Sequence, residues 1–226
     1  SSARTIVLAT TDKVYRFPDS DNTELAELGG KDFYSASKAG AEFVIEAYKG
    51  IKKRDDLNLS VIRSGNVIGG GDRAEYRLIK EIVDSINLGT TFELRKPNSI
   101  RPWQFILDSL WGYLMAAQDN FDNQANEVFN LNSELNNEFT AEKIVQTFFE
   151  NWEGEVPEIK ITKEEFAEVN VLKINSAKAA DLLNWKPIYD VETTIMKIIE
   201  WENAFKKDKN MDLSISQILQ YLDDRA

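Results

Sequence analysis

Thr5-Ile6-Val7-Leu8-Ala9-Thr10 opens the chain as a short apolar run, and Thr11-Asp12-Lys13 follows it directly. A continuous apolar run of this length predicts a buried strand. A second such run covers residues 59–63, and the segment between them, residues 34–53, has apolar residues at helical spacing. Because strands that alternate with amphipathic helices form α/β folds, the sequence predicts a mainly parallel sheet.

The same alternation continues to the end of the chain. Helices are expected near residues 76–87, 109–118, 140–149, 177–183, 192–205 and 213–222, and strands near 91–94, 104–107, 127–131 and 171–174. From about residue 133 the pattern becomes mainly helical and acidic. This change predicts a smaller, α-rich lobe that packs on the sheet.

The composition excludes several kinds of chemistry. Among 226 residues there is no Cys and no His, so disulfides, Cys-type zinc sites, imidazole ligands and Ser-His-Asp triads are all ruled out. Acid–base work must fall to Tyr, Lys, Asp or Glu. Lys and Arg number 27 against 38 Asp and Glu, and the net charge of −11 argues against nucleic acid or an anionic membrane as a partner.

The ends of the chain carry two further expectations. No apolar stretch approaches the roughly 20 residues that span a bilayer, and no signal peptide is evident, which favours a soluble, cytoplasmic protein. The chain does not begin with Met, and it enters a buried-looking strand almost at once. We therefore expect a fragment or a processed chain.

Polar side chains after the first strand are the first candidates for chemistry. Thr11, Asp12 and Lys13 follow that strand, and ligands in open α/β sheets bind outside the carboxyl ends of the strands. The alternative is an ordinary turn, since Thr and Asp favour loops.

Tyr34 and Lys38 form a Tyr-x-x-x-Lys pair on one face of the first predicted helix. A neighbouring ammonium favours a phenolate, which is what a general base for a sugar hydroxyl needs. Spacing alone cannot select this pair, because Tyr48 and Tyr76 also have Lys four residues later. Tyr34 is preferred because it opens its helix just after Gly29-Gly30.

The Gly-rich run at residues 65–74 lies between a strand and a helix. Gly69, Gly71 and Ala74 formally satisfy G-x-G-x-x-G/A, but they lie too far past the strand for the tight turn of a dinucleotide loop. A flexible, ligand-facing loop fits better, with Asn66 able to hydrogen-bond a substrate. Three cations, Arg77, Arg95 and Arg101, would suit a diphosphate if they share a crevice; surface ion pairs are the alternative.

Six motifs in order resemble the extended short-chain dehydrogenase/reductase family, and most specifically its CDP-glucose 4,6-dehydratases. The motifs are Thr11-Asp12-Lys13-Val14-Tyr15, Gly29-Gly30, Tyr34-Ser35-Ala36-Ser37-Lys38-Ala39-Gly40-Ala41-Glu42, Gly65-Asn66-Val67-Ile68-Gly69-Gly70-Gly71-Asp72, Arg77-Leu78-Ile79 and Ser99-Ile100-Arg101-Pro102-Trp103-Gln104. Trp185-Lys186-Pro187 is similar to the family's closing segment. The resemblance implies NAD as cofactor and a nucleotide sugar as substrate.

The resemblance also implies roles for single residues. Tyr34, with Lys38 beside it, would remove the proton of the sugar 4-hydroxyl, and Thr11 would hydrogen-bond that oxygen; Tyr34 and Lys38 would also touch the nicotinamide ribose. Asp12 would protonate the departing 6-hydroxyl. Lys13 would help to remove the proton at carbon 5, or would only position water or substrate. Asn66, Arg77, Arg95 and Arg101 would bind the substrate.

The family's fold normally starts with a strand, a Gly-rich turn and a helix, and no such unit precedes Ser1 here. The resemblance therefore implies a partial Rossmann-like, doubly wound parallel sheet. Residues 1–132 would be the C-terminal half of the NAD-binding domain with interleaved substrate segments, and residues 133–226 would be mainly a substrate-binding lobe. The missing half would come from another chain, or the protein would be a homo-oligomer. Two other functions stay open: an extended-family epimerase of another nucleotide sugar, and a non-catalytic remnant or interaction module.

Overall fold

Three parallel strands form the central sheet of the protein. In this computed structural model, which describes residues 3–18, 21–51, 57–133, 139–162, 171–209 and 212–226, the strand order is β1 (Thr5–Ala9), β2 (Asn58–Ser64) and β6 (Val128–Leu131). Ile6 lies opposite Leu59, and Ile62 lies opposite Phe129. Because β2 lies between the other two strands, all of its residues are buried, as its apolar sequence predicts.

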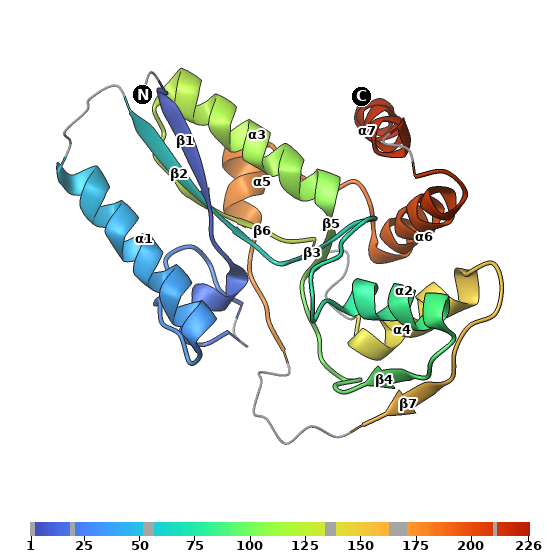
Figure 1. The fold of residues 1–226 in the computed structure, drawn as a ribbon. Helices are drawn as coiled ribbons and strands as arrows, with labels where there is room; N and C mark the ends of the chain where they lie inside the picture. The colour runs from blue at the N-terminus through green and yellow to red at the C-terminus, as the bar shows by residue number, and fades with distance from the viewer. Residues whose placement is uncertain (1–2, 19–20, 52–56, 134–138, 163–170, 210–211) are drawn as a thin grey trace.

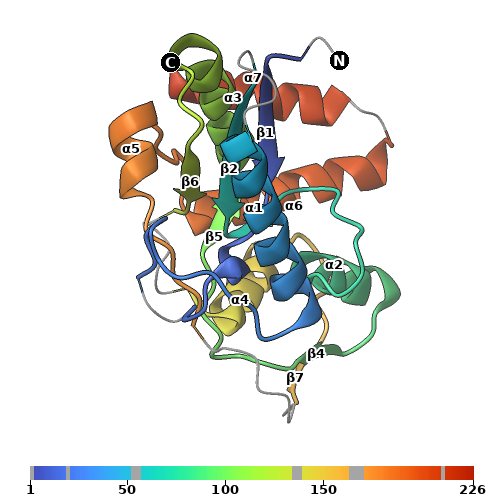
Figure 2. The ribbon, with the colours of Figure 1, turned by 90° about the vertical axis from the view of Figure 1, so that its left-hand side faces the viewer.

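Helices cover both faces of this sheet (Figures 1 and 2). The helix α1 (Phe33–Ile51) lies on one face, and α3 (Ile106–Asn123) lies on the other with α5 (Ala177–Leu183) beside it. A core of Ile62, Ala116, Phe129, Leu131, Ala179, Leu183 and Trp185 fills the space between the sheet, α3 and α5. The predicted α/β class with a parallel sheet is confirmed.

A second layer of structure lies beyond the carboxyl ends of these strands (Figure 1). Its short parallel pairs are β3 (Asn66–Ile68) with β5 (Trp103–Phe105), and β4 (Phe92–Leu94) with β7 (Ile159–Ile161). The helices α2 (Leu78–Leu88), α4 (Ala141–Asn151) and α6 (Val191–Lys207) pack around them. Their shared core joins residues from both sides of position 133, including Ile82, Ile144 and Ile198.

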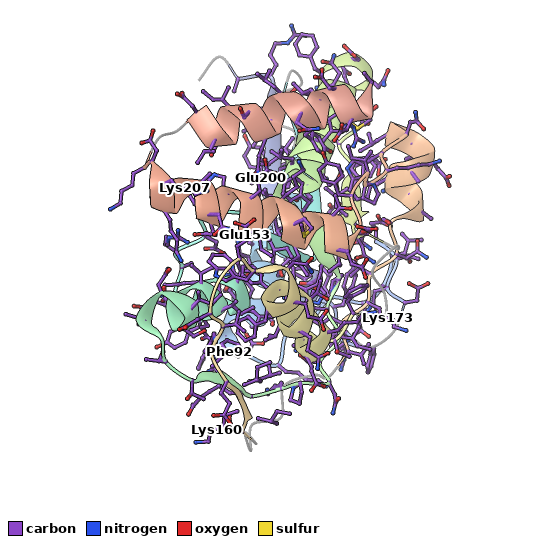
Figure 3. All side chains as sticks on the ribbon, turned by 90° about the vertical axis from the view of Figure 1, so that its right-hand side faces the viewer. Phe92, Glu153, Lys160, Lys173, Glu200 and Lys207 are labelled. Carbon is purple, nitrogen blue, oxygen red and sulfur yellow. The ribbon has the colours of Figure 1, made fainter. Side chains whose placement is uncertain are left out.

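The last helix, α7 (Asp212–Arg225), runs beside α6. Figure 3 shows α6 with Glu200 and Lys207 along its length, while Phe92 and Lys160 mark β4 and β7 below it. Aromatic contacts join α7 to the rest of the protein: the ring of Tyr221 lies 6.3 Å from that of Phe105 and 5.7 Å from that of Tyr189. The C-terminal helix therefore completes the packing around β5.

Two of the observed strands were not predicted from the sequence, and one predicted strand does not form. The three-residue strands β3 and β7 pair with residues far away in the chain, so no local periodicity marks them. The strand expected at 171–174 is wrong, since that segment makes only isolated bridges, from Val171 to Ile100 and from Ile174 to Asn22. Ile106, expected at the end of a strand, instead begins α3.

Candidate active site

Polar residues cluster where β1 ends. Thr11 caps a short 3-10 helix, Asp12–Val14, and its Oγ1 atom accepts a hydrogen bond from the backbone N–H of Lys13 at 3.3 Å. The same hydroxyl donates to Oδ1 of Asp12 at 3.0 Å. This turn directs Asp12 inward, and both Thr11 and Asp12 are buried. The segment is thus a turn and also a buried polar site, so the two alternatives for it do not exclude each other.

Asp12 is a carboxyl group with an unusual environment. It is 3% exposed, and its Oδ2 atom has no hydrogen-bond partner among the described residues. Burial raises the pKa of Asp12 to about 6, although the Thr11 hydrogen bond and the charges of Lys13 and Arg101 act in the opposite direction. A carboxyl group with a pKa near neutrality can hold a proton and then donate it, which suits a general acid.

The burial of Asp12 should make the free energy of unfolding depend on pH. Because the folded-state pKa of about 6 lies above the ordinary 3.8, burial of the ionised form costs stability as the pH rises through that window. Asp12→Asn removes this cost. We expect the variant to gain about 2 to 3 kcal/mol relative to the wild type between pH 4 and pH 7, measured by urea unfolding at several pH values.

Asp32→Asn is the matched control for that measurement. Hydrogen bonds from Ser35 lower the pKa of Asp32, so its contribution to stability is present above the unfolded-state pKa and is lost as the pH falls. The difference between Asp32→Asn and the wild type should therefore change with pH in the opposite sense. A pH-independent effect of Asp12→Asn would contradict the burial of an ionisable carboxyl at this position.

Tyr34 and Lys38 lie on the first two turns of α1. Asp32 starts this helix, since its carboxylate accepts hydrogen bonds from the backbone N–H of Ser35 at 2.9 Å and from its hydroxyl at 2.6 Å. The Lys38 ammonium donates to the carbonyl of Ala9, the last residue of β1, at 3.3 Å. Tyr34 is 50% exposed. The structure therefore places the Lys38 ammonium at the strand end that leads into Thr11 and Asp12, with Tyr34 half-exposed one helical turn before it.

A buried polar network that the sequence reasoning missed joins α1 to the sheet. Glu42 accepts hydrogen bonds from Thr10 at 2.6 Å and from Arg63 at 2.5 to 3.0 Å. Arg63 also donates to the Tyr15 hydroxyl at 2.9 Å, which donates to Asn130 at 2.6 Å. Burial raises the pKa of Tyr15 to about 12, so it stays a phenol. The sequence held one indication of this network: an Arg at the end of a buried apolar strand needs a hydrogen-bonding or charged partner.

The Gly-rich run does not form a flexible loop. A Cβ atom on Gly70 would lie 2.4 Å from the Trp201 ring, and one on Gly71 would lie 2.7 Å from it. Glu202, buried on α6, accepts hydrogen bonds from the backbone N–H of Gly71 at 3.0 Å and from Arg73 at 2.7 and 2.8 Å. The glycines are thus needed for close packing against α6, which corrects the expectation of a flexible, ligand-facing segment.

The four predicted substrate-binding residues have different surroundings. Asn66 is half-buried at the start of β3, where its backbone N–H donates to Pro102 at 2.9 Å. Arg101 is buried, and its charge acts on Asp12, so these two lie within electrostatic range. Arg95 makes an ion pair with Glu81 at 2.7 Å, the surface pairing that was the alternative for it. Arg77 is exposed just before α2, where its side chain makes no capping hydrogen bond.

The described residues contain neither a cluster of metal-ligating side chains nor a membrane-spanning helix. Within residues 3–18, 21–51, 57–133, 139–162, 171–209 and 212–226, no group of three or more Asp or Glu side chains is arranged to hold a metal ion. In those same ranges no helix has the length and apolar character needed to cross a lipid bilayer.

Comparison with known proteins gives a consistent set of similarities. Residues 2–198 match the family described as GDP-mannose 4,6 dehydratase. The chain is 31% identical over 223 residues to CDP-glucose 4,6-dehydratase of Salmonella typhimurium, an alignment that covers 92% of this chain and 61% of that protein. The chain therefore spans about three fifths of the length of this curated relative.

Solved structures share the fold. A UDP-glucose 4-epimerase of Stenotrophomonas maltophila, crystallised with NAD and a formylated UDP-arabinopyranose, has a TM-score of 0.77 at 15% identity, with 90% of this chain and 64% of that chain covered. A dTDP-glucose 4,6-dehydratase of Bacillus anthracis in complex with NAD has a TM-score of 0.72 at 22% identity, with 90% and 62% covered.

Proposed function

The chain belongs to the GDP-mannose 4,6 dehydratase family, within the extended short-chain dehydrogenases/reductases, and from this premise we propose that it carries the catalytic residues of an NAD-dependent nucleotide-sugar 4,6-dehydratase. The observation that carries the proposal is that a buried carboxyl follows the end of β1, where the helix that bears Tyr34 and Lys38 contacts the same strand end through Lys38. Asp12 is buried with a pKa raised to about 6, and Tyr34 is exposed beside Lys38. One group suits an acid and the other a base, as a dehydration requires. The 31% identity to a CDP-glucose 4,6-dehydratase supports CDP-glucose as the substrate.

The described residues fit the nicotinamide end of NAD. An ammonium carries three donors, and the hydrogen bond that the structure gives for Lys38 goes to Ala9, which leaves donors for ribose hydroxyls. Tyr34, four residues before Lys38 on α1, is half-exposed. We therefore assign Tyr34 and Lys38 to the nicotinamide ribose. When bound, NAD supplies reversible storage of a hydride.

Tyr34 and Thr11 act first on the sugar. Tyr34, one helical turn before Lys38, would take the proton of the 4-hydroxyl as that carbon is oxidised. Thr11, whose hydroxyl already contacts Asp12, hydrogen-bonds the same sugar oxygen. The resulting 4-ketone acidifies the hydrogen on carbon 5, which prepares the loss of water.

Asp12 and Lys13 then act on carbons 6 and 5. Burial raises the pKa of Asp12 to about 6, so that the protonated carboxyl is accessible near neutral pH, and it would give that proton to the departing 6-hydroxyl. Removal of the proton on carbon 5 completes the loss of one water molecule. The hydride taken from carbon 4 would then return to carbon 6 and a proton to carbon 5, which gives the 4-keto-6-deoxy sugar. We propose that Lys13, half-buried next to Asp12, helps to remove the proton on carbon 5 or only positions water or the substrate.

The remaining assignments concern the nucleotide and the rest of the sheet. Arg101 carries a buried positive charge near Asp12, and we propose that it holds the diphosphate together with Arg77 and Asn66. Arg95 would have to leave its ion pair with Glu81 to contribute. Among the described strands, β1 pairs only with β2. That open edge supports a further strand beside β1, and with it the assignment of residues 1–132 to the C-terminal half of a dinucleotide-binding domain. We propose that residues 133–226 are mainly a substrate lobe, apart from α5 and Trp185, which pack on the central sheet.

The test is turnover by the protein at its natural length. We expect CDP-glucose, incubated with the protein and NAD, to give the 4-keto-6-deoxy sugar, detected by its carbonyl and by mass loss of one water. UDP-glucose, dTDP-glucose and GDP-mannose serve as matched comparisons. A 4-epimer without loss of water would instead identify an epimerase. Failure of the protein to turn over or to bind any of these nucleotide sugars would favour a non-catalytic module.

A further inference from the structure

The helix that carries Tyr34 and Lys38 has few apolar anchors. Its buried residues are Ser35, Ala39 and Glu42. Two of these side chains are small, and small side chains present a smooth surface that does not select one position of a helix on a sheet. The long apolar residues of α1, such as Phe43 and Val44, are exposed. Apolar packing therefore leaves the placement of this helix under-determined.

Glu42 is the long buried side chain of α1, and its contacts are directional. Both of its carboxylate oxygens accept from Arg63 on β2, at 2.5 to 3.0 Å, and one also accepts from the Thr10 hydroxyl at 2.6 Å. Each member of the ion pair has a side chain that is only 4% exposed. The planar guanidinium fixes both the distance and the angle of a carboxylate that it binds through two nitrogen atoms.

These contacts tie α1 to the residues of the candidate active site. Glu42 follows Lys38 by four residues and Tyr34 by eight, so the three lie along one stripe of the helix. Thr10 directly precedes Thr11, and its backbone N–H is held by Ile62 at 2.8 Å. Arg63 in turn is held by Tyr15, which directly follows the short helix of Asp12. The network therefore contacts both the helix that carries Tyr34 and Lys38 and the segments that flank Thr11 and Asp12.

We propose that Glu42 is a positioning residue: its ion pair with Arg63 and its hydrogen bond to Thr10 set the position of α1 on the sheet, and thus the position of Tyr34 and Lys38 relative to Thr11 and Asp12. A buried ion pair adds little net stability over well-packed apolar residues, but it accepts only one geometry. The effect on turnover rests on the proposed function, whereas the effect on helix position does not.

The kinetic test uses three variants of the pair. Glu42→Gln and Arg63→Met each break it and should lower kcat about 100-fold with little change in the KM for the nucleotide sugar, because a misplacement of about 1 Å is enough for such a loss. The double variant Glu42→Met with Arg63→Leu removes both charges and leaves no buried ion unpaired. It should recover the unfolding midpoint of the wild type while kcat stays low.

Ser60→Ala is the matched control. It removes a buried hydrogen bond to Asn120 at 2.8 Å, on the same strand as Arg63 but towards its other end. This variant should lose stability and keep the wild-type kcat per folded molecule. A double variant at Glu42 and Arg63 with both wild-type stability and wild-type kcat would overturn the proposal, because the pair would then have only a structural role.

A readout independent of activity separates this proposal from the function on which it rests. The chain has no Cys, so spin labels can be placed uniquely at Gly40→Cys on α1, where a Cβ meets nothing within 4 Å, and at Leu114→Cys on α3. Breaking the pair should shift or broaden the distance distribution between the labels, while Ser60→Ala should not. An unchanged distribution in Glu42→Gln would overturn the positioning role; a changed one in a protein without dehydratase activity would overturn only the function.

Discussion

Tyr34→Phe is expected to lower the kcat for nucleotide-sugar turnover by about 1,000-fold, with the KM changed by less than about threefold. In the proposed reaction the phenol oxygen accepts the proton of the sugar 4-hydroxyl, and phenylalanine has no oxygen to do so. Tyr34 is half-exposed, so loss of its hydroxyl leaves the fold unchanged. Initial rates with CDP-glucose, together with thermal unfolding of both proteins, measure the effect.

Tyr48→Phe is the control for that variant. Tyr48 lies on the same helix, is 43% exposed and also has a Lys four residues later, so it shares the sequence spacing and the exposure of Tyr34. It lies far along the helix from the end of β1, and its replacement should leave kcat within about twofold of the wild type. If the two variants behaved alike, the assignment of the base to Tyr34 would fail.

Asp108→Ala is expected to give the largest loss of stability, about 3 to 5 kcal/mol in the free energy of unfolding. Asp108 has no exposed surface at the start of α3, and its carboxylate accepts from the backbone N–H of Ile188 at 3.0 Å and from the Tyr221 hydroxyl at 2.7 Å. It also pairs with Arg225 at 3.4 Å. Removing it leaves several buried donors unsatisfied and detaches α7. Urea unfolding gives the loss, and limited proteolysis reports the release of α7.

Asp190→Ala calibrates this result. Asp190 also accepts a backbone hydrogen bond, from Thr193 at 2.7 Å, but it does so as the exposed N-cap of α6. Its loss should cost only about 1 kcal/mol. Similar losses from the two variants would mean that Asp108 does not hold the C-terminal helix. Asp108 and Asp190 have no role in the proposed reaction, so neither variant tests it.

Several features of the fold could be predicted from the sequence because they depend on nearby residues. The apolar runs that became β1 and β2, and the helical spacing of α1, α4 and α6, are local patterns set by burial of one face or of both. Strands were expected near β4 and β5, but β3 and β7 and the pairing of β3 with β5 and of β4 with β7 were not, because the paired residues lie about 37 and 67 positions apart in the chain.

In the candidate site, too, some residues could be predicted from local sequence and others depend on distant residues. Thr11, Asp12, Tyr34 and Lys38 were selected from their residue types, their spacing and their place after a strand or at a helix start, all of which are visible in the sequence. The glycines of residues 69–71 show the opposite case. Their pattern suggested a loop open to a ligand, and their actual role depends on Trp201 and Glu202, which lie about 130 residues later.

The sequence by itself determined the fold class, the excluded chemistries and the residue types available for acid–base work. Only the tertiary structure decided their physical state: that Asp12 is buried with a pKa raised to about 6, that Glu42 is paired with Arg63, and that Arg95 is paired with Glu81. The reason is that periodicity reports which face of an element is apolar. Desolvation and ion pairing depend on which distant charges and hydrogen-bond groups the fold brings within a few ångströms.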